Sequence, residues 1–161
     1  MMLEIEVMRL DKDLPLPRYA HPGDAGIDLV AAKDALLSPR GGRCSIPTGL
    51  AIAIPFGYAV FIQPRSGLAL HHGITCLNSP GLIDSGYRGE IKVVLVNLDP
   101  TSPFEVKRFM RIAQLLIKQV EQISLKPVES LDSSERNETG FGHSGYYTDI
   151  EVNGNIEVDR V

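Results

Sequence analysis

Residues 91–97 of the chain read IKVVLVN, a run in which five of the seven side chains are apolar and three are valines. Branched side chains of this kind favour extended strands, because they pack well on a pleated surface. Similar runs recur at 3–10, 50–54, 58–62, 104–109 and 112–120. Turn clusters rich in proline and glycine separate several of them, as at 55–57 and 99–103. The sequence therefore predicts a mostly β fold with closely spaced turns.

Helical periodicity is weak, and one segment, 66–72 (SGLALHH), is predicted as a short helix. Ser66 is its expected N-cap and Gly73 its expected stop. Strands do not alternate with helices along the chain, which excludes a doubly wound parallel sheet. An all-β sandwich, jelly roll or small barrel is the predicted architecture.

Composition limits the class of protein further. The chain has 161 residues, 43% of them apolar, which fits one globular domain. Its 16 basic and 20 acidic residues give a net charge of −4, so the charge pattern expected for nucleic-acid binding is missing. Cys44 and Cys76 form no CxxC pair, and a reducing cytoplasm suits them. We expect a cytoplasmic protein without a membrane partner, because no apolar run approaches the ~20 residues of a membrane span.

The last part of the chain differs in composition from the rest. From Glu129 onward it is polar, rich in acidic residues and poor in material for a core. We therefore expect a β domain over 1–128 and a flexible C-terminal arm over 129–161, ending in an acidic tail.

Three segments carry residues suited to chemistry. The first, Pro64-Arg65-Ser66-Gly67, places a guanidinium, a hydroxyl and an unencumbered N–H at the end of a predicted strand, a combination that binds phosphate oxygens. Taken alone, the same four residues also fit a capped helix with a surface arginine.

The second segment, 78–90 (NSPGLIDSGYRGE), leads into the IKVVLVN strand. It carries Asp84 and, three residues later, Tyr87, and a hairpin here would form a pocket. The alternatives are ordinary ones: Asp84 suits a turn, and Tyr87 could be a core or cross-strand aromatic.

The third segment, 136–145 (RNETGFGHSG), alternates glycines with an aromatic residue, a histidine and a hydroxyl. It is interpreted as a lid in which Arg136 binds an anion while Phe141 stacks on a flat ring. The alternative is a glycine-rich linker.

As a set, these segments resemble the five ordered motifs of the homotrimeric dUTPase family. The five matching segments are 24–29 (DAGIDL), 64–69 (PRSGLA), 81–90 (GLIDSGYRGE), 111–115 (RIAQL) and 136–145. Together they span about three quarters of the chain. The amino-acid sequence around the third motif is most similar to that of actinobacterial members.

The resemblance implies a jelly-roll-like distorted β-barrel with one short helix and a mobile arm. It also implies that dUTP is hydrolysed to dUMP and pyrophosphate, which limits uracil incorporation into DNA and supplies dUMP for dTMP synthesis. Water would attack the α-phosphorus, with Mg²⁺ bound across the triphosphate. Three subunits of a homotrimer would share each active site.

The same resemblance assigns roles to individual residues. Asp84 would be the general base, and Asp28 would accept hydrogen bonds from metal-bound water. The phosphate chain would be held by Arg65, Ser66, Gly67 and Gln114, and closed over by Arg136, Gly142, His143 and Ser144. Uracil would pair with main-chain groups of the 78–87 hairpin, namely those near Asn78, Gly81, Leu82 and Ile83. Tyr87 would lie against the deoxyribose, and Phe141 would cover the base.

Some residues carry less weight. Lys92 could reach a ligand, although a solvated strand lysine is the simpler interpretation. His71 and His72 are expected to be surface or packing residues, because neighbouring residues on a helix point ~100° apart. In the fifth motif, 137–139 replace the usual glycine-rich spacer and His143 stands where serine is common.

Two alternatives to dUTP hydrolysis share the fold. One is a dCTP deaminase or a bifunctional deaminase–dUTPase, and the other is a non-catalytic nucleotide-binding module. The intact YRGE sequence and the glycine-rich fifth motif argue against the deaminase. The presence of Asp84, Tyr87 and Arg136 argues against the non-catalytic module.

Overall fold

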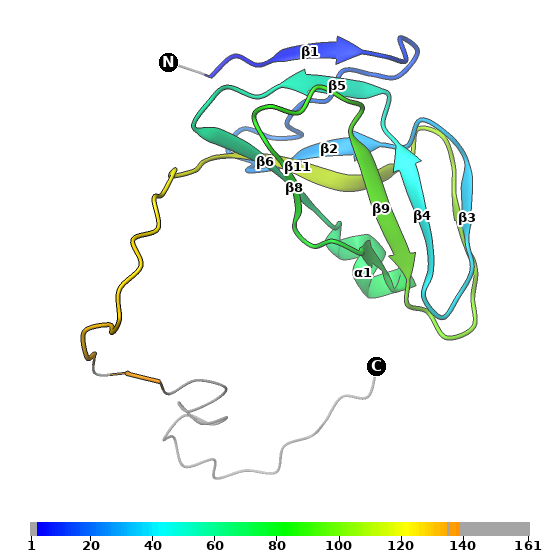
Figure 1. Ribbon diagram of the computed structural model, residues 1–161. Helices are drawn as coiled ribbons and strands as arrows, with labels where there is room; N and C mark the ends of the chain where they lie inside the picture. The colour runs from blue at the N-terminus through cyan, green and yellow to red at the C-terminus, as the bar shows by residue number, and fades with distance from the viewer. Residues whose placement is uncertain (1–2, 135, 139–161) are drawn as a thin grey trace. The chain divides into compact units, whose positions relative to one another are not determined.

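The computed structural model describes residues 3–134 and 136–138 (Figure 1). The chain divides into two compact units, Met1–Ile123 and Ser124–Val161. All the strands and the helix of the described residues lie in the first unit. No helix in the described part of the chain has the length and apolar character needed to span a membrane.

The first unit contains eleven strands in its described residues. They are β1 (Glu6–Arg9), β2 (Ile27–Val30), β3 (Ala35–Leu37), β4 (Gly42–Pro47), β5 (Leu50–Ala53), β6 (Tyr58–Gln63), β7 (Ile74–Cys76), β8 (Gly81–Ile83), β9 (Lys92–Asn97), β10 (Phe104–Val106) and β11 (Arg111–Gln119). Every pairing between them is antiparallel. The predicted all-β class with one short helix is confirmed.

These strands form four sheets, with the orders β1-β5, β10-β3, β2-β11-β6-β8 and β4-β9-β7. Within the described residues they do not close into one continuous barrel. Figure 1 shows β9 and β4 running steeply across the direction of β2 and β11. The core contains side chains from both of the larger sheets, including Leu29, Val60, Val93, Leu95 and Ile112.

The predicted strands differ from the observed ones mainly at their ends and where they are short. The prediction over 3–10 is too long, since β1 covers only Glu6–Arg9. The strand predicted over 104–109 stops at Val106, and Phe109 adopts a left-handed φ of 72° that ends extended structure. The strands β2, β3, β4, β7 and β8 were not predicted, because segments such as GRCSIP in β4 lack a distinctive apolar pattern.

The helix α1 (Ser66–His72) lies where the sequence predicts it. Its C-terminal stop is confirmed, because Gly73 has a left-handed φ of 63° and its N–H donates to Ala69 O. The predicted cap is wrong: Arg65 occupies the N-cap position, without a side-chain capping bond, and Ser66 is the first helical residue.

The two cysteines lie on the β4-β9-β7 sheet. Cys44 in β4 and Cys76 in β7 are both register partners of Leu95 in β9, so one strand separates them. Two strand spacings amount to about 10 Å, too far for a disulfide. Both thiols are free, and burial raises the pKa of Cys76 to about 11.

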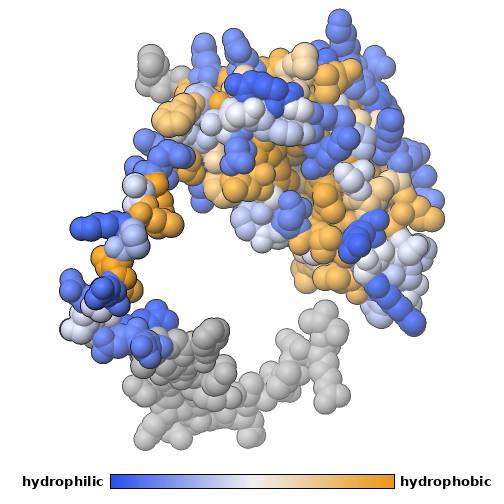
Figure 2. Space-filling model, viewed as in Figure 1, coloured by the Kyte–Doolittle hydropathy of each residue, from blue (hydrophilic) through white to orange (hydrophobic). Residues whose placement is uncertain are grey.

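Apolar residues are interspersed with charged ones over the face of the molecule shown in Figure 2. Exposed apolar side chains of the first unit include Phe56, Leu36 and Leu82. Polar residues are rare in the core, and Asn97 is fully buried at the end of β9.

The Asn97 amide joins three parts of the chain. Its Nδ2 donates to Leu37 O at 3.2 Å and to Ser102 O at 2.9 Å, and its Oδ1 accepts from Asp99 N at 2.9 Å. A buried amide is tolerated only when its hydrogen bonds are made. This one fixes the 99–102 turn against β3.

We expect Asn97→Ala to lower the free energy of unfolding by about 3 kcal/mol, because it leaves three backbone groups without this partner. Urea denaturation of the purified variant measures the change. Ser102→Ala is the matched control, because Ser102 is exposed and accepts the Asn97 bond through its main-chain carbonyl, which alanine keeps. Removal of the serine hydroxyl should change the free energy of unfolding by less than about 0.5 kcal/mol. Equal effects of the two substitutions would contradict this role of Asn97.

Candidate active site

The segment between β8 and β9 builds the first part of the site. The predicted hairpin is wrong as a paired element, because β8 pairs with β6 while β9 pairs with β4 and β7. The segment instead crosses from one sheet to the other. Within it, Tyr87 N donates to Asp84 O at 3.1 Å, which closes a turn over the DSGY sequence.

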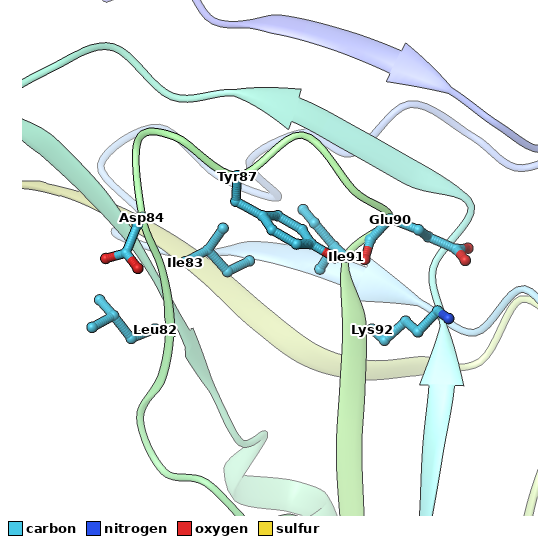
Figure 3. A pocket seen from close by; sticks show the side chains of 7 residues that line it. All are labelled: Leu82, Ile83, Asp84, Tyr87, Glu90, Ile91 and Lys92. Carbon is cyan, nitrogen blue, oxygen red and sulfur yellow. Dashed lines mark hydrogen bonds between the residues drawn. The ribbon is translucent and has the colours of Figure 1, made fainter.

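This crossing segment lines a cavity of about 320 Å³, a size typical of small-molecule sites. Its lining residues are Leu82, Ile83, Asp84, Tyr87, Glu90, Ile91 and Lys92. In Figure 3 the Asp84 carboxylate lies at one end near Leu82, and the Tyr87 ring extends toward Glu90 and Ile91. The pocket predicted here is therefore present, and Lys92 lies on its wall.

Tyr87 is not a core aromatic, since its side chain is 45% exposed. Its hydroxyl donates to Glu90 O at 2.9 Å, which holds the ring along the segment. The Arg88 guanidinium donates to Ser85 O at 2.6 Å and to Tyr87 O at 2.8 Å, which braces the turn. Tyr87 is thus held both at its main chain and at its hydroxyl.

The far end of the crossing segment is clamped to residues 48–50. Thr48, which is fully buried, donates from Oγ1 to Ile91 O at 2.7 Å and from its N–H to the same oxygen at 3.2 Å. Ile91 N donates to Leu50 O at 2.8 Å, and Gly49 N donates to Glu90 Oε1 at 2.9 Å. These four bonds make 90–91 the rigid base of the cavity.

A second group of residues meets around strand β11. Gln114 is the register partner of both Asp28 in β2 and Gln63 in β6. The Asp28 carboxylate accepts from Arg65 Nε at 3.1 Å and from Arg111 Nη1 at 3.3 Å. Asp28 is therefore an ion-paired strand residue.

Arg111 is a residue that the sequence reasoning did not select. It lies at the start of β11, three residues before Gln114, within the RIAQL segment. Its proximity to Gln114 was the available signal, but the pairing with Asp28 depends on the β2–β11 register. Arg65 Nη1 also donates to Arg111 O at 3.4 Å, so the two arginines share one surface.

Two cavities open beside this group, and Gln114 lines both. One, of about 360 Å³, is lined by Ala20, Asp24, Ala25, Gly26, Asp28, Gln63, Gln114 and Leu116. The other, of about 300 Å³, is lined by Arg65, Ser66, Gly67, Leu68, His71, His72 and Gln114. With a guanidinium, a hydroxyl, an amide and two imidazoles on its wall, the second cavity is suited to an anion.

The two histidines of α1 differ in their surroundings. The His72 ring lies 5.1 Å from the Phe104 ring, centroid to centroid, as expected for a packing residue. His71 is exposed and lines the Arg65 cavity without such a ring partner among the described residues. Sequence reasoning missed His71 as a lining residue, because the cavity combines residues of α1 with Gln114 of β11, which is distant in the sequence.

The predicted site residues thus fall into separate groups. Asp84, Tyr87, Lys92, Leu82 and Ile83 line one cavity, and Asn78 and Gly81 line a smaller hollow of about 60 Å³ beside it, together with Leu82, Ile83 and Lys92. Asp28, Arg65, Ser66, Gly67 and Gln114 line the two cavities at β11. Arg136 belongs to the second unit, whereas Phe141, Gly142, His143 and Ser144 lie outside the described residues.

Comparison with known proteins explains this set of residues. A family model described as dUTPase matches residues 12–145. The chain is 57% identical over 143 residues to the deoxyuridine 5'-triphosphate nucleotidohydrolase of Thermobifida fusca, covering 89% of this chain and 79% of the relative. The chain belongs to the dUTPase family. The enzyme of the same name from Corynebacterium glutamicum is 51% identical over 141 residues, covering 88% of this chain and 94% of that one.

Solved structures agree with this family assignment. The dUTPase of Staphylococcus bacteriophage 80alpha, solved with dUPNHPP, aligns with a TM-score of 0.82 and 29% identity, covering 89% of this chain and 99% of that one. The predicted jelly-roll-like β fold and the similarity to actinobacterial dUTPases are confirmed. The chain is a dUTP diphosphatase that hydrolyses dUTP, and the deaminase and non-catalytic alternatives are not favoured.

Pyrophosphate binding tests the Arg65 cavity directly. We expect Arg65→Ala to weaken pyrophosphate binding about 10- to 100-fold, since a hydrogen bond to a charged group is worth about 1.5–3 kcal/mol. We expect His71→Ala to weaken it about threefold, as the loss of a single hydrogen bond. Isothermal titration calorimetry in the presence of Mg²⁺ measures both.

Leu70→Ala is the matched control for these two substitutions. Leu70 is on the same helix, is 73% exposed and does not line the cavity, so pyrophosphate affinity should not change. An Arg65→Ala variant that binds pyrophosphate as tightly as the unmodified chain would rule out this cavity as the anion site.

Proposed function

We propose that this dUTPase cleaves dUTP, bound as its Mg²⁺ complex, in active sites that three copies of the chain assemble together. The products are dUMP and pyrophosphate. The observation that carries the proposal is the separation, on one chain, of the Asp84 cavity from the Arg65 and Asp28 cavities, which have no lining residue in common with it.

The register of β6 gives the scale of this separation. Asp84 follows Ile83, whose partner in β6 is Val60, whereas Arg65 follows the opposite end of the same strand at Gln63. At a rise of about 3.3 Å per residue, up to roughly 16 Å of extended chain lies between Val60 and Arg65. Asp84 and Arg65 therefore lie in different cavities of one chain, and each would meet a different part of a bound triphosphate. A neighbouring copy that brings its own Arg65 to Asp84 would join the two groups in one site.

Asp84 is assigned as the general base that orients and deprotonates the attacking water. Its side chain is exposed in the cavity, and no cation pairs with it among the described residues. A carboxylate of this kind can accept the proton of a water aimed at the α-phosphorus. Positioning and charge stabilisation supply most of the remaining catalysis in phosphoryl transfer.

The phosphate chain is assigned to Arg65, Ser66, Gly67 and Gln114. Within the described residues no group of three or more His, Cys, Asp or Glu side chains could hold a metal, so Mg²⁺ is assigned to the substrate complex. Asp28 fits a contact through metal-bound water. Each of its oxygens accepts one arginine hydrogen bond, and a carboxylate offers about four acceptor positions.

Base and sugar selection are assigned to the crossing segment. Main-chain groups at Asn78, Gly81, Leu82 and Ile83 would pair with the uracil edge, while Tyr87 would lie against the deoxyribose and exclude a 2′-hydroxyl. Lys92 on the same cavity wall is an added contact. Rejection of a larger sugar here depends on shape, because a close-packed ring leaves no room for another oxygen.

The arm completes the proposal. A β domain over 1–128 would be joined to an arm over 129–161 that closes a site with Arg136, Phe141, Gly142, His143 and Ser144. A homotrimer is the assembly in which one copy supplies Asp84, another Arg65 and a third the arm. A cytoplasmic location suits the free thiols of Cys44 and Cys76.

We expect Asp84→Asn to lower kcat for dUTP by about 10²- to 10⁴-fold, the usual contribution of a general base. The affinity for dUTP should stay within about threefold, because the amide keeps the shape of the carboxylate. Release of dUMP and pyrophosphate with Mg²⁺ measures kcat, with UTP, dTTP and dCTP assayed in parallel. Undiminished turnover by the variant would refute the base, and ammonia from dCTP would indicate deamination.

Shared sites predict complementation between inactive chains. Co-expression of Asp84→Asn and Arg65→Ala chains in equal amounts should restore about one quarter of wild-type activity, since half of the chains keep each group. A chain carrying both substitutions, mixed with wild type, should also give about one quarter, not one half. No recovery in the first mixture and one half in the second would mean that each chain builds its own site.

A further inference from the structure

Gly89 lies directly beneath the Tyr87 side chain. A Cβ built on Gly89 would lie 2.5 Å from the Tyr87 hydroxyl oxygen, 2.7 Å from Cζ and 3.1 Å from Cε2. Apart from the adjacent residues, these are the three nearest heavy atoms, and all belong to the Tyr87 side chain. Two of the distances are far inside van der Waals contact, so no side chain fits here while the ring keeps its place.

The backbone beneath the ring cannot move aside easily. Glu90 and Ile91, which follow Gly89, are held to residues 48–50 by the four hydrogen bonds described above. On the other side, Tyr87 N is bonded to Asp84 O and Tyr87 O to the Arg88 guanidinium. The soft coordinates are the torsions of the Tyr87 side chain, so an added methyl group would displace the ring.

Displacement has a defined direction. The ring extends along the crossing segment toward Glu90 (Figure 3), and its hydroxyl is bonded to the Glu90 carbonyl. A methyl group on Gly89 pushes the hydroxyl end away from that carbonyl and breaks the bond. The ring then leaves its place in the wall of the cavity that Asp84 and Lys92 also line, so the shape that distinguishes the two sugars is lost.

We propose that Gly89 is a positioning residue for sugar discrimination: the missing side chain lets the Tyr87 ring lie close against the 89–90 backbone, at the depth that admits a 2′-deoxyribose and rejects a ribose. This inference rests on the proposed contact of Tyr87 with the sugar. Gly89 itself need not touch the substrate.

The loop supplies its own control. Gly86 lies immediately before Tyr87, and a Cβ built there meets nothing within 4 Å. Neither glycine has a positive φ, so alanine is compatible with the backbone at both positions. Gly89→Ala and Gly86→Ala therefore add the same methyl group to the same loop, and only the first meets the tyrosine.

The experiment measures kcat/KM for dUTP and for UTP in the presence of Mg²⁺. We expect Gly89→Ala to lower the preference for dUTP over UTP at least tenfold, with most of the loss in kcat/KM for dUTP. Gly86→Ala should keep the preference within twofold. A fall in stability alone would lower both rates together and leave their ratio unchanged.

A double-mutant cycle with Tyr87→Ala keeps the inference testable even if Gly89→Ala folds poorly. Without the ring the closest atoms to the new methyl group are gone, so Gly89→Ala should change neither the dUTP preference nor Tm further in the Tyr87→Ala background. Equal effects of Gly89→Ala in both backgrounds would overturn the inference, as would an unchanged preference in a folded Gly89→Ala enzyme.

The outcome separates this inference from the function on which it rests. If Tyr87→Ala leaves the dUTP preference intact, the sugar contact itself fails. If Tyr87→Ala removes the preference but Gly89→Ala does not, the sugar contact stands and the positioning role of Gly89 is wrong.

Discussion

The antiparallel ladder of β11 between β2 and β6 is the constraint on which the rest of the site depends. Gln114 lies opposite Asp28 on one side and Gln63 on the other. A slip of one residue would turn Gln114 to the opposite face of the sheet. Beyond a register shift between Arg111 and Ala113, Arg111 lies opposite Val30 and donates to the Asp28 carboxylate. Arg65, just after β6, donates to the same carboxylate. The charged cluster is thus a consequence of strand pairing, and the buried neighbours Ile112 and Ala113 hold that pairing in the core.

The crossing segment is held in place in a different way. It has no sheet partner of its own between Asp84 and Glu90, and side-chain and turn bonds take the place of a ladder. Its ends are fixed by β8 and by the Thr48 clamp, while its middle presents an exposed carboxylate and a half-exposed ring to the cavity. A loop of this construction combines a rigid base with reactive groups in solvent, which is what substrate binding requires. In the proposed site, Gly89 would act through the Tyr87 side chain, which its missing Cβ leaves room for.

The groups proposed to act in the reaction also lie in separate parts of the chain. The proposed base Asp84 lies near one end of β6, and Arg65, which we propose binds phosphate, lies beyond the other end. In the proposed homotrimer, hydrolysis would depend on assembly, because the reacting groups would meet only between copies. An isolated chain would then bind parts of a nucleoside triphosphate without bringing the general base and the phosphate together.

The sequence by itself determined the all-β class, the one helix over 66–72 and its stop at Gly73, because β-branched runs and a left-handed glycine are local properties. It also determined the family, since the five ordered motifs can be identified in the sequence without any knowledge of the fold. Only the tertiary structure decided that β8 and β9 belong to different sheets, that Asp28 pairs with Arg111, that His71 lines the Arg65 cavity and that Gly89 supports Tyr87. Each of these depends on the register or packing of segments, which periodicity and turn chemistry do not encode. Short strands such as β3 and β7 were not predicted for the same reason. A segment of three residues is too short to show an apolar pattern, and its pairing partner holds it extended.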